Sequence, residues 1–116
     1  MLDRWIEEVK ERASPEELGM ILVHTGIVRA SSKAGKPVRG MMLSHDRQRL
    51  DSIIPAFKQR AGIVEVRVWI NSGTLEVGDT IMLLLVAGRF RTDVLPVFEE
   101  LLSVIKREIV TEEEIR

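Results

Sequence analysis

Apolar and polar residues alternate along the first part of the chain with a period that changes from helical to extended. Within residues 2–13, apolar side chains recur at helical spacing, and Ser14-Pro15 marks the end, so residues 1–17 are expected to form an N-terminal helix and turn. Residues 18–28 are mostly apolar and rich in branched side chains, which favours a strand. A polar, glycine-containing loop follows, and residues 38–43 are apolar again, which predicts a second strand.

A second helix and two more strands are predicted in the middle of the chain. Asp46 suits the N-cap of a helix that ends at Gly62, and Pro55 inside it is expected to kink it, because proline lacks a backbone donor. Residues 63–70 alternate with period two, as in a strand with one apolar face. Residues 81–87 form a continuous apolar run, which predicts a central strand covered on both faces.

The last apolar segment predicts a third helix, followed by an acidic tail. Thr92 or Asp93 can cap this helix, and Pro96 then falls in its first turn, where the missing donor costs little. The tail, residues 109–116, is expected to fray. The order of elements predicts one α+β domain over residues 1–116, with helices packed on a largely antiparallel sheet.

The composition indicates a soluble cytoplasmic protein. The 17 basic and 18 acidic residues leave a net charge of -1, which gives no reason to expect nucleic acid as a partner. The chain has no cysteine, so a disulfide, a thiolate zinc site and a cysteine nucleophile are excluded, in keeping with a reducing compartment. No apolar stretch is long enough to cross a membrane, and the N-terminus lacks a signal-peptide pattern.

No common catalytic or metal-binding motif is complete. A phosphate-binding loop at Gly35-Lys36 would need a glycine in place of Ala30 and a hydroxyl residue in place of Pro37. His24 and His45 are the only histidines, and neither has a second ligand at metal-binding spacing. The acidic residues show no spacing typical of a general acid–base pair. We therefore expect no metal site and no cofactor.

Cations that follow apolar segments are the most informative feature. Arg29 ends the first predicted strand. Lys106 continues an apolar stripe along the last predicted helix, whose earlier members are Leu95, Phe98 and Leu102. A lysine there either extends its stem along the apolar surface into solvent, where the helix C-terminus also favours it, or lines a pocket.

Two further cations, Arg89 and Arg91, leave the predicted central strand. In an extended chain their side chains would share one side, opposite Phe90, and surface ion pairing is the alternative role for such a pair. A straight helix from Arg91 to Lys106 would hold these two side chains roughly 22 Å apart. If both bind one small anion, the site is therefore shared between subunits, with Arg91 of one chain meeting Lys106 of another.

With these residues in view, the chain resembles the MoaE family, the large catalytic subunit of molybdopterin synthase, over roughly residues 18–108. The landmarks are an arginine that ends a strand before a polar loop, a glycine-containing turn before an apolar strand, and an arginine followed by a helix that ends in lysine. They are Thr25-Gly26-Ile27-Val28-Arg29, Gly73-Thr74-Leu75-Glu76-Val77-Gly78-Asp79, and Arg91 with Lys106. Their order and spacing carry the resemblance.

The resemblance implies an α/β hammerhead fold and a homodimer flanked by two copies of a small, ubiquitin-like, MoaD-like subunit. The C-terminal Gly-Gly tail of that subunit, carried as a thiocarboxylate, would enter a pocket of the large subunit. The implied reaction is a sulfur transfer to cyclic pyranopterin monophosphate, which forms molybdopterin in molybdenum cofactor biosynthesis. The resemblance also implies Lys106 as the catalytic lysine, Arg29 as an anion-binding arginine and Arg91 as an arginine from the neighbouring subunit. Arg89 is a further substrate-binding candidate.

Three positions differ from the family's pattern. Phe90 stands where the family usually has histidine, and His24 stands where it often has an aromatic residue. Glu113 falls where the family has a second pocket lysine, and a carboxylate beside an anionic substrate is expected to weaken binding and slow the reaction. These differences favour an alternative function, a noncatalytic MoaE-like paralogue that binds an anion or the small-subunit tail without turnover.

Overall fold

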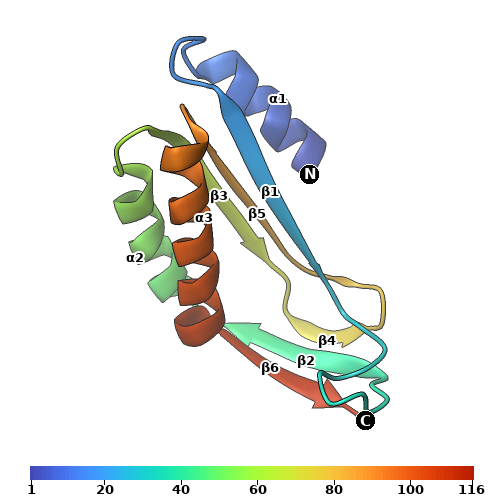
Figure 1. Cartoon of the computed structure of the whole chain (residues 1–116). Coiled ribbons are helices and arrows are strands. Elements are labelled where there is room, and N and C mark those ends of the chain that lie inside the picture. The colour runs from blue at the N-terminus through green and yellow to red at the C-terminus, as the bar shows by residue number, and fades with distance from the viewer.

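Six strands form two separate three-stranded sheets in the computed structural model, which describes residues 1–116 (Figure 1). The first sheet has the order β1-β5-β3, with β1 at Met20–Ile27, β5 at Thr80–Gly88 and β3 at Ile63–Ile70. The second sheet has the order β4-β2-β6, with β4 at Gly73–Glu76, β2 at Gly40–His45 and β6 at Val110–Ile115. All pairs of neighbouring strands are antiparallel, as the sequence predicts.

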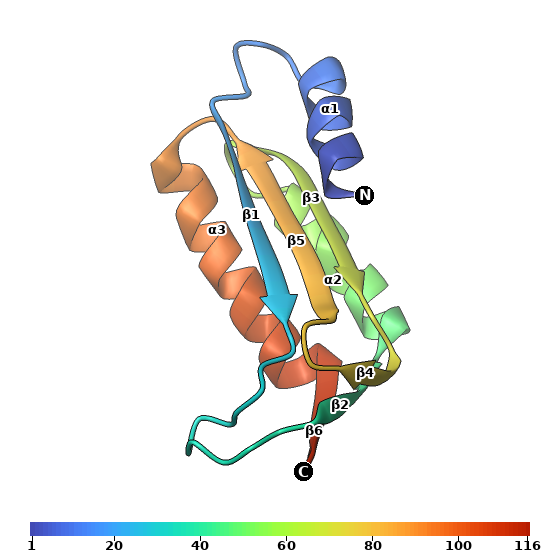
Figure 2. The same ribbon diagram turned by 90° about the vertical axis from the view of Figure 1, so that its right-hand side faces the viewer.

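Helices cover both faces of the first sheet (Figures 1 and 2). One face carries α1 (Leu2–Arg12), and the other carries α2 (Arg47–Lys58) and α3 (Arg91–Val104). A π-helical segment, η1 (Ile105–Ile109), continues α3 and leads into β6. The second sheet lies beyond one end of these layers, and the molecule is elongated, with extents of 49 × 25 × 23 Å. None of the helices has the length and apolar character needed to pass through a membrane.

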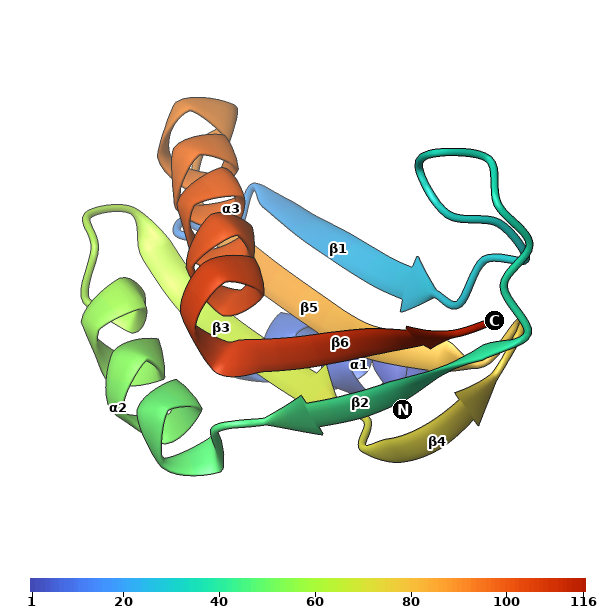
Figure 3. The same ribbon diagram turned by 90° about the horizontal axis from the view of Figure 1, so that it is seen from below.

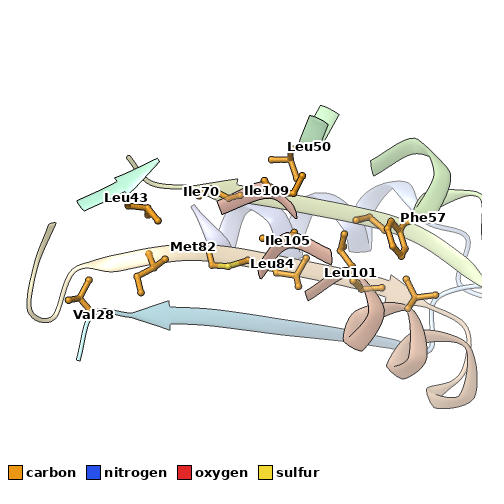
Figure 4. Close-up of a cluster of buried hydrophobic side chains, with 14 of the residues drawn as sticks. Val28, Leu43, Leu50, Phe57, Ile70, Met82, Leu84, Leu101, Ile105 and Ile109 are labelled. Atoms are coloured by element: carbon orange, nitrogen blue, oxygen red, sulfur yellow. The ribbon is translucent and has the colours of Figure 1, made fainter. Parts of the chain in front are cut away.

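The two faces of β5 belong to two different apolar clusters. Leu84 and Val86 pack with buried residues of α2 and α3 in the main core (Figure 4). Leu85 and Ala87 point the other way and pack with Val9 of α1. Successive side chains of a strand point to opposite faces, so a strand that is apolar at every position needs cover on both. The prediction made from the continuous apolar run is confirmed.

The start of α2 is as predicted, and its end is earlier. Asp46 is the N-cap, and its Oδ1 accepts a hydrogen bond from the backbone N–H of Arg49 at 3.0 Å. Pro55 lies inside the helix without ending it. The helix ends at Lys58, whereas Gly62, with a φ of 79°, belongs to the turn before β3.

The start of α3 differs from the prediction. Its N-cap is Phe90, and neither Thr92 nor Asp93 caps the helix. The Asp93 carboxylate instead accepts a hydrogen bond from Arg89 Nε at 3.3 Å, so a tertiary ion pair takes the side chain that would have capped the helix. Pro96 consequently lies in the second turn and not in the first.

The acidic tail is ordered, contrary to the expectation that residues 109–116 fray. It forms β6, which pairs with β2 along its whole length (Figure 3). Its successive glutamates lack the alternation of a half-buried strand, and the pairing comes instead from the free backbone edge of β2. The short strand β4 was also not predicted, because it lies between two turn sequences.

Leu101→Ala should lower the free energy of unfolding by about 2–5 kcal/mol, because the side chain is fully buried and its loss leaves a cavity. The matched control is Leu95→Ala on the same helix, where the side chain is 39% exposed. Both changes alter helix propensity equally, so the control should lose about 1 kcal/mol or less. Urea unfolding followed by circular dichroism measures both, and equal losses would contradict the core described here.

Candidate functional site

A cleft of about 200 Å³ opens where the end of β1, the loop after it, the second sheet and η1 meet. The loop and the end of β6 lie side by side, and the backbone N–H of Arg39 donates to the carbonyl of Ile115 at 2.7 Å (Figure 3). Apolar side chains form part of the wall. The polar lining consists of three cations, two carboxylates and two serines: Arg29, Lys33, Lys106, Glu112, Glu114, Ser31 and Ser32.

Lys106 reaches the cleft from a fixed stretch of backbone. It lies in η1 between Ile105 and Ile109, and both isoleucine side chains are buried in the core. The N–H of Val110 bonds to the carbonyl of Ile105, which closes the wide turn typical of a π-helix. The Lys106 side chain itself is 56% exposed. Of the two roles that the sequence leaves open, the structure shows that this lysine lines a pocket.

Arg29 reaches the same cleft from the end of β1. The residue before it, Val28, is buried, donates its N–H to the carbonyl of Asp79 at 3.0 Å, and accepts from the N–H of Gly78 at 2.9 Å. The backbone that carries Arg29 is therefore fixed. Its Nη2 donates to Ser31 Oγ at 3.4 Å, and the remaining guanidinium donors suit an oxyanion.

Two carboxylates of β6 face these cations. Glu112 Oε1 lies 4.0 Å from Lys106 Nζ, and Glu114 lines the same cleft. Glu113 lies between them in sequence but does not line the cleft, because neighbouring side chains of a strand point to opposite faces. The carboxylate beside Lys106 is therefore that of Glu112, not that of Glu113 as the spacing predicted.

Arg89 and Arg91 lie at the opposite end of α3 from Lys106 and do not line this cleft. Arg89 pairs with Asp93, and its guanidinium lies over the ring of Phe90, 5.0 Å from the centroid. It thus takes the ion-pairing role that the sequence leaves as the alternative. Arg91 is the exposed first residue of α3. One chain therefore brings only two of the four candidate cations into the cleft.

The composition of the cleft suits an anion. No group of three or more His, Cys, Asp or Glu side chains lies close enough to hold a metal ion. The guanidinium of Arg29 and the ammonium groups of Lys33 and Lys106 offer several charged donors to one ligand. The sequence did not point to Lys33, Glu112 or Glu114 as members of the site.

A family model described as MoaE protein matches residues 3–108 of the chain. The chain belongs to the MoaE family. The matched residues include Arg29, Arg91 and Lys106, whereas the whole of β6 lies beyond them. The resemblance that the sequence motifs carry is confirmed, and the match extends further toward the N-terminus than the motifs do.

Several solved structures share the fold of this MoaE-family chain. One is the complex of subunits 1 and 2 of molybdopterin-converting factor from Helicobacter pylori 26695 (TM-score 0.77, 19% identity, 97% of this chain and 74% of that one). A second is molybdopterin synthase from Staphylococcus aureus (0.76, 20% identity, 95% and 82%). A third is molybdopterin cofactor biosynthesis protein E from Burkholderia multivorans (0.77, 21% identity, 100% and 82%). These matches confirm the predicted α+β, hammerhead-like fold. Among curated proteins, no match to the chain was found.

In this MoaE-family protein, His24 lies on β1 next to α3. Its ring meets the ring of Phe98 edge to face, with 6.4 Å between centroids, and its Nε2 is buried without a protein hydrogen-bond partner. Burial lowers the pKa of His24 below its ordinary value, and the positive charge of Lys106 lowers it further. Both causes favour the neutral imidazole.

His24→Phe should make the stability of the protein less sensitive to acid. The lowered pKa means that the unfolded chain binds the proton more readily, so the stability tied to the neutral ring is complete above about pH 6.5 and is lost as the pH falls through the lower folded pKa. Phenylalanine cannot titrate. Urea unfolding at about pH 7.5 and about pH 5 should therefore show a smaller acid loss in the variant. An equal loss in the parent protein and the variant would contradict this assignment.

Proposed function

We propose that this MoaE-family protein is the large subunit of a molybdopterin synthase and acts in molybdenum cofactor biosynthesis. In the proposed reaction, sulfur passes from the C-terminal thiocarboxylate of a small subunit to cyclic pyranopterin monophosphate, which becomes molybdopterin. The observation that carries the proposal is the meeting of Arg29 and Lys106 in one cleft of a MoaE-family fold. The names of structures with the same fold support it, because they include a molybdopterin synthase and a molybdopterin cofactor biosynthesis protein.

Arg29 and Lys106 have different proposed roles. The planar guanidinium of Arg29 binds the substrate phosphate, because it offers paired N–H donors, and Lys33 lines the same cleft. Lys106 is the proposed catalytic lysine. Its ammonium group stabilises the negative charge of the thiocarboxylate and the charge that develops on the substrate during transfer. The proposal requires neither a metal nor a cofactor.

The proposed assembly is a homodimer with a small MoaD-like subunit at each end. The H. pylori structure with the same fold is a complex of two different subunits, which supports a small-subunit partner. Arg91 begins α3 and Lys106 follows its end, so a second copy has to supply the Arg91 that completes this cleft. Arg89 lies beside Arg91 and is proposed to bind substrate at the same shared site. The lack of cysteine fits a reducing cytoplasm as the place of this reaction.

Lys106→Ala should lower the rate of molybdopterin formation at least about a hundredfold, the usual cost of removing one group that stabilises transition-state charge. The assay combines the purified protein with a thiocarboxylated small subunit and cyclic pyranopterin monophosphate. Arg107→Ala is the control, since Arg107 is the next cation in the chain but does not line the cleft. No product above a reaction with the small subunit alone would refute the enzymatic proposal. A Lys106→Ala enzyme as fast as the parent would remove this lysine from the mechanism.

Mixing the inactive variants Lys106→Ala and Arg91→Ala should restore activity if the site is shared. After exchange of subunits, half of the dimers are mixed and each mixed dimer has one intact site, so about a quarter of the parent activity should return. A mixture in which each variant is combined with itself is the control. Recovery no greater than that of the separate variants would place both residues in one subunit's site or leave Arg91 outside it.

A noncatalytic paralogue is the second candidate function. The exposed Phe90 before Arg91 and the carboxylate of Glu112 beside Lys106 favour it, because both change the charge or donors available to an anionic substrate. Calorimetric binding of a small subunit's Gly-Gly tail together with the absence of product would support this function. Detectable turnover would exclude it.

A further inference from the structure

The cleft contains two carboxylates that a simple anion-binding site does not need. Arg29, Lys33 and Lys106 attract an anion, whereas Glu112 and Glu114 repel it. Both glutamates are in β6, so the same strand that closes the cleft also brings negative charge into it. The net field of the cleft is therefore weakly positive, although it is rich in cations.

Glu112 is the carboxylate that acts most directly on Lys106. Its Oε1 lies 4.0 Å from Lys106 Nζ, and no other carboxylate is within ion-pair distance of that lysine. The position of Glu112 is fixed by strand pairing, because it lies opposite the buried residue Leu43 of β2. The two charged side chains are 56% and 32% exposed, so the pair is open to a competing ligand.

We propose that Glu112 determines the charge specificity of the cleft, as a resident counter-ion of Lys106 that favours singly charged oxyanions over doubly charged ones. The inference rests on the proposed function, in which the ligands of this cleft are a small-subunit carboxylate and a cyclic phosphate diester, each with a single negative charge. A phosphate monoester carries nearly two charges above its second pKa of about 6. Repulsion by Glu112 scales with the ligand's charge, so the monoester meets about twice the penalty.

The test uses probes of similar size and different charge. Dimethyl phosphate carries one negative charge, and methyl phosphate carries two at about pH 8. Acetyl-Gly-Gly with a free carboxylate represents the tail, and its amidated form is the uncharged control. Each probe is titrated into the full-length protein, and binding is followed by chemical-shift changes in two-dimensional NMR spectra, which also report whether each variant is folded.

Glu112→Gln should tighten the binding of all three charged probes, and its effect should be larger for methyl phosphate. Because the pair is partly exposed, the affinity for methyl phosphate should rise roughly two- to fivefold relative to dimethyl phosphate. Glu113→Gln is the matched control: it removes the same charge from the neighbouring position of β6, but Glu113 does not line the cleft. Its charge preference should equal that of the parent protein. Glu114→Gln should fall between the two, since Glu114 lines the cleft without pairing with Lys106.

Equal charge preferences in the Glu112→Gln and Glu113→Gln proteins would overturn the proposal, and so would the absence of binding by every charged probe. The two phosphate probes and the tail peptide separate the sources of the oxyanion, because each reports its own affinity. Failure of the proposed function looks different. A protein that forms no molybdopterin but shows the charge preference loses the enzymatic function and keeps the role of Glu112, whereas turnover with an unchanged preference does the reverse.

Discussion

The side chains from Leu84 to Ala87 are completely buried, so β5 needs apolar partners on both of its faces at once. Burying one such aliphatic side chain contributes roughly 1.5–3 kcal/mol, which makes this strand the largest single concentration of apolar stabilisation in the fold. The requirement is met by α1 on one side and by α2 and α3 on the other (Figure 2). Since α3 has to run along β5 to cover it, the end of α3 arrives at the second sheet.

The candidate site forms at that arrival point. Ile105 anchors the end of the helix in the core and Ile109 anchors the end of the π turn, so the chain enters β6 with little freedom. On the other side of the cleft, Val28 is tied by two backbone hydrogen bonds to the turn before β5. Lys106 and Arg29 each follow or lie next to such an anchor. Two flexible side chains therefore start from rigid positions, as a site that orients a small ligand requires.

The sequence predicts most strongly those parts of the fold that depend on side-chain burial. The alternation in residues 63–70 and the apolar run in residues 81–87 mark β3 and β5, and Arg29 and Lys106 were recognised because each follows an apolar stretch. The pairing of β6 depends on backbone hydrogen bonds to β2, to which its glutamate side chains contribute no pattern. Because the tail was expected to fray, its alternation was not used to decide which glutamates face the cleft. The N-cap of α3 was missed for a related reason: the carboxylate of Asp93 is engaged by Arg89, a contact that no local pattern reveals.

The π turn also limits how the length of this chain can change over evolution. Loss of a single residue between Ile105 and Val110 would convert the wide turn into an ordinary helical one and shift β6 by one position along β2. Such a shift would exchange the two faces of the strand, turning Glu113 toward the cleft and the flanking glutamates away from it. Substitutions in this segment adjust the charge of the cleft gradually, whereas an odd-numbered insertion or deletion would reverse it in one step.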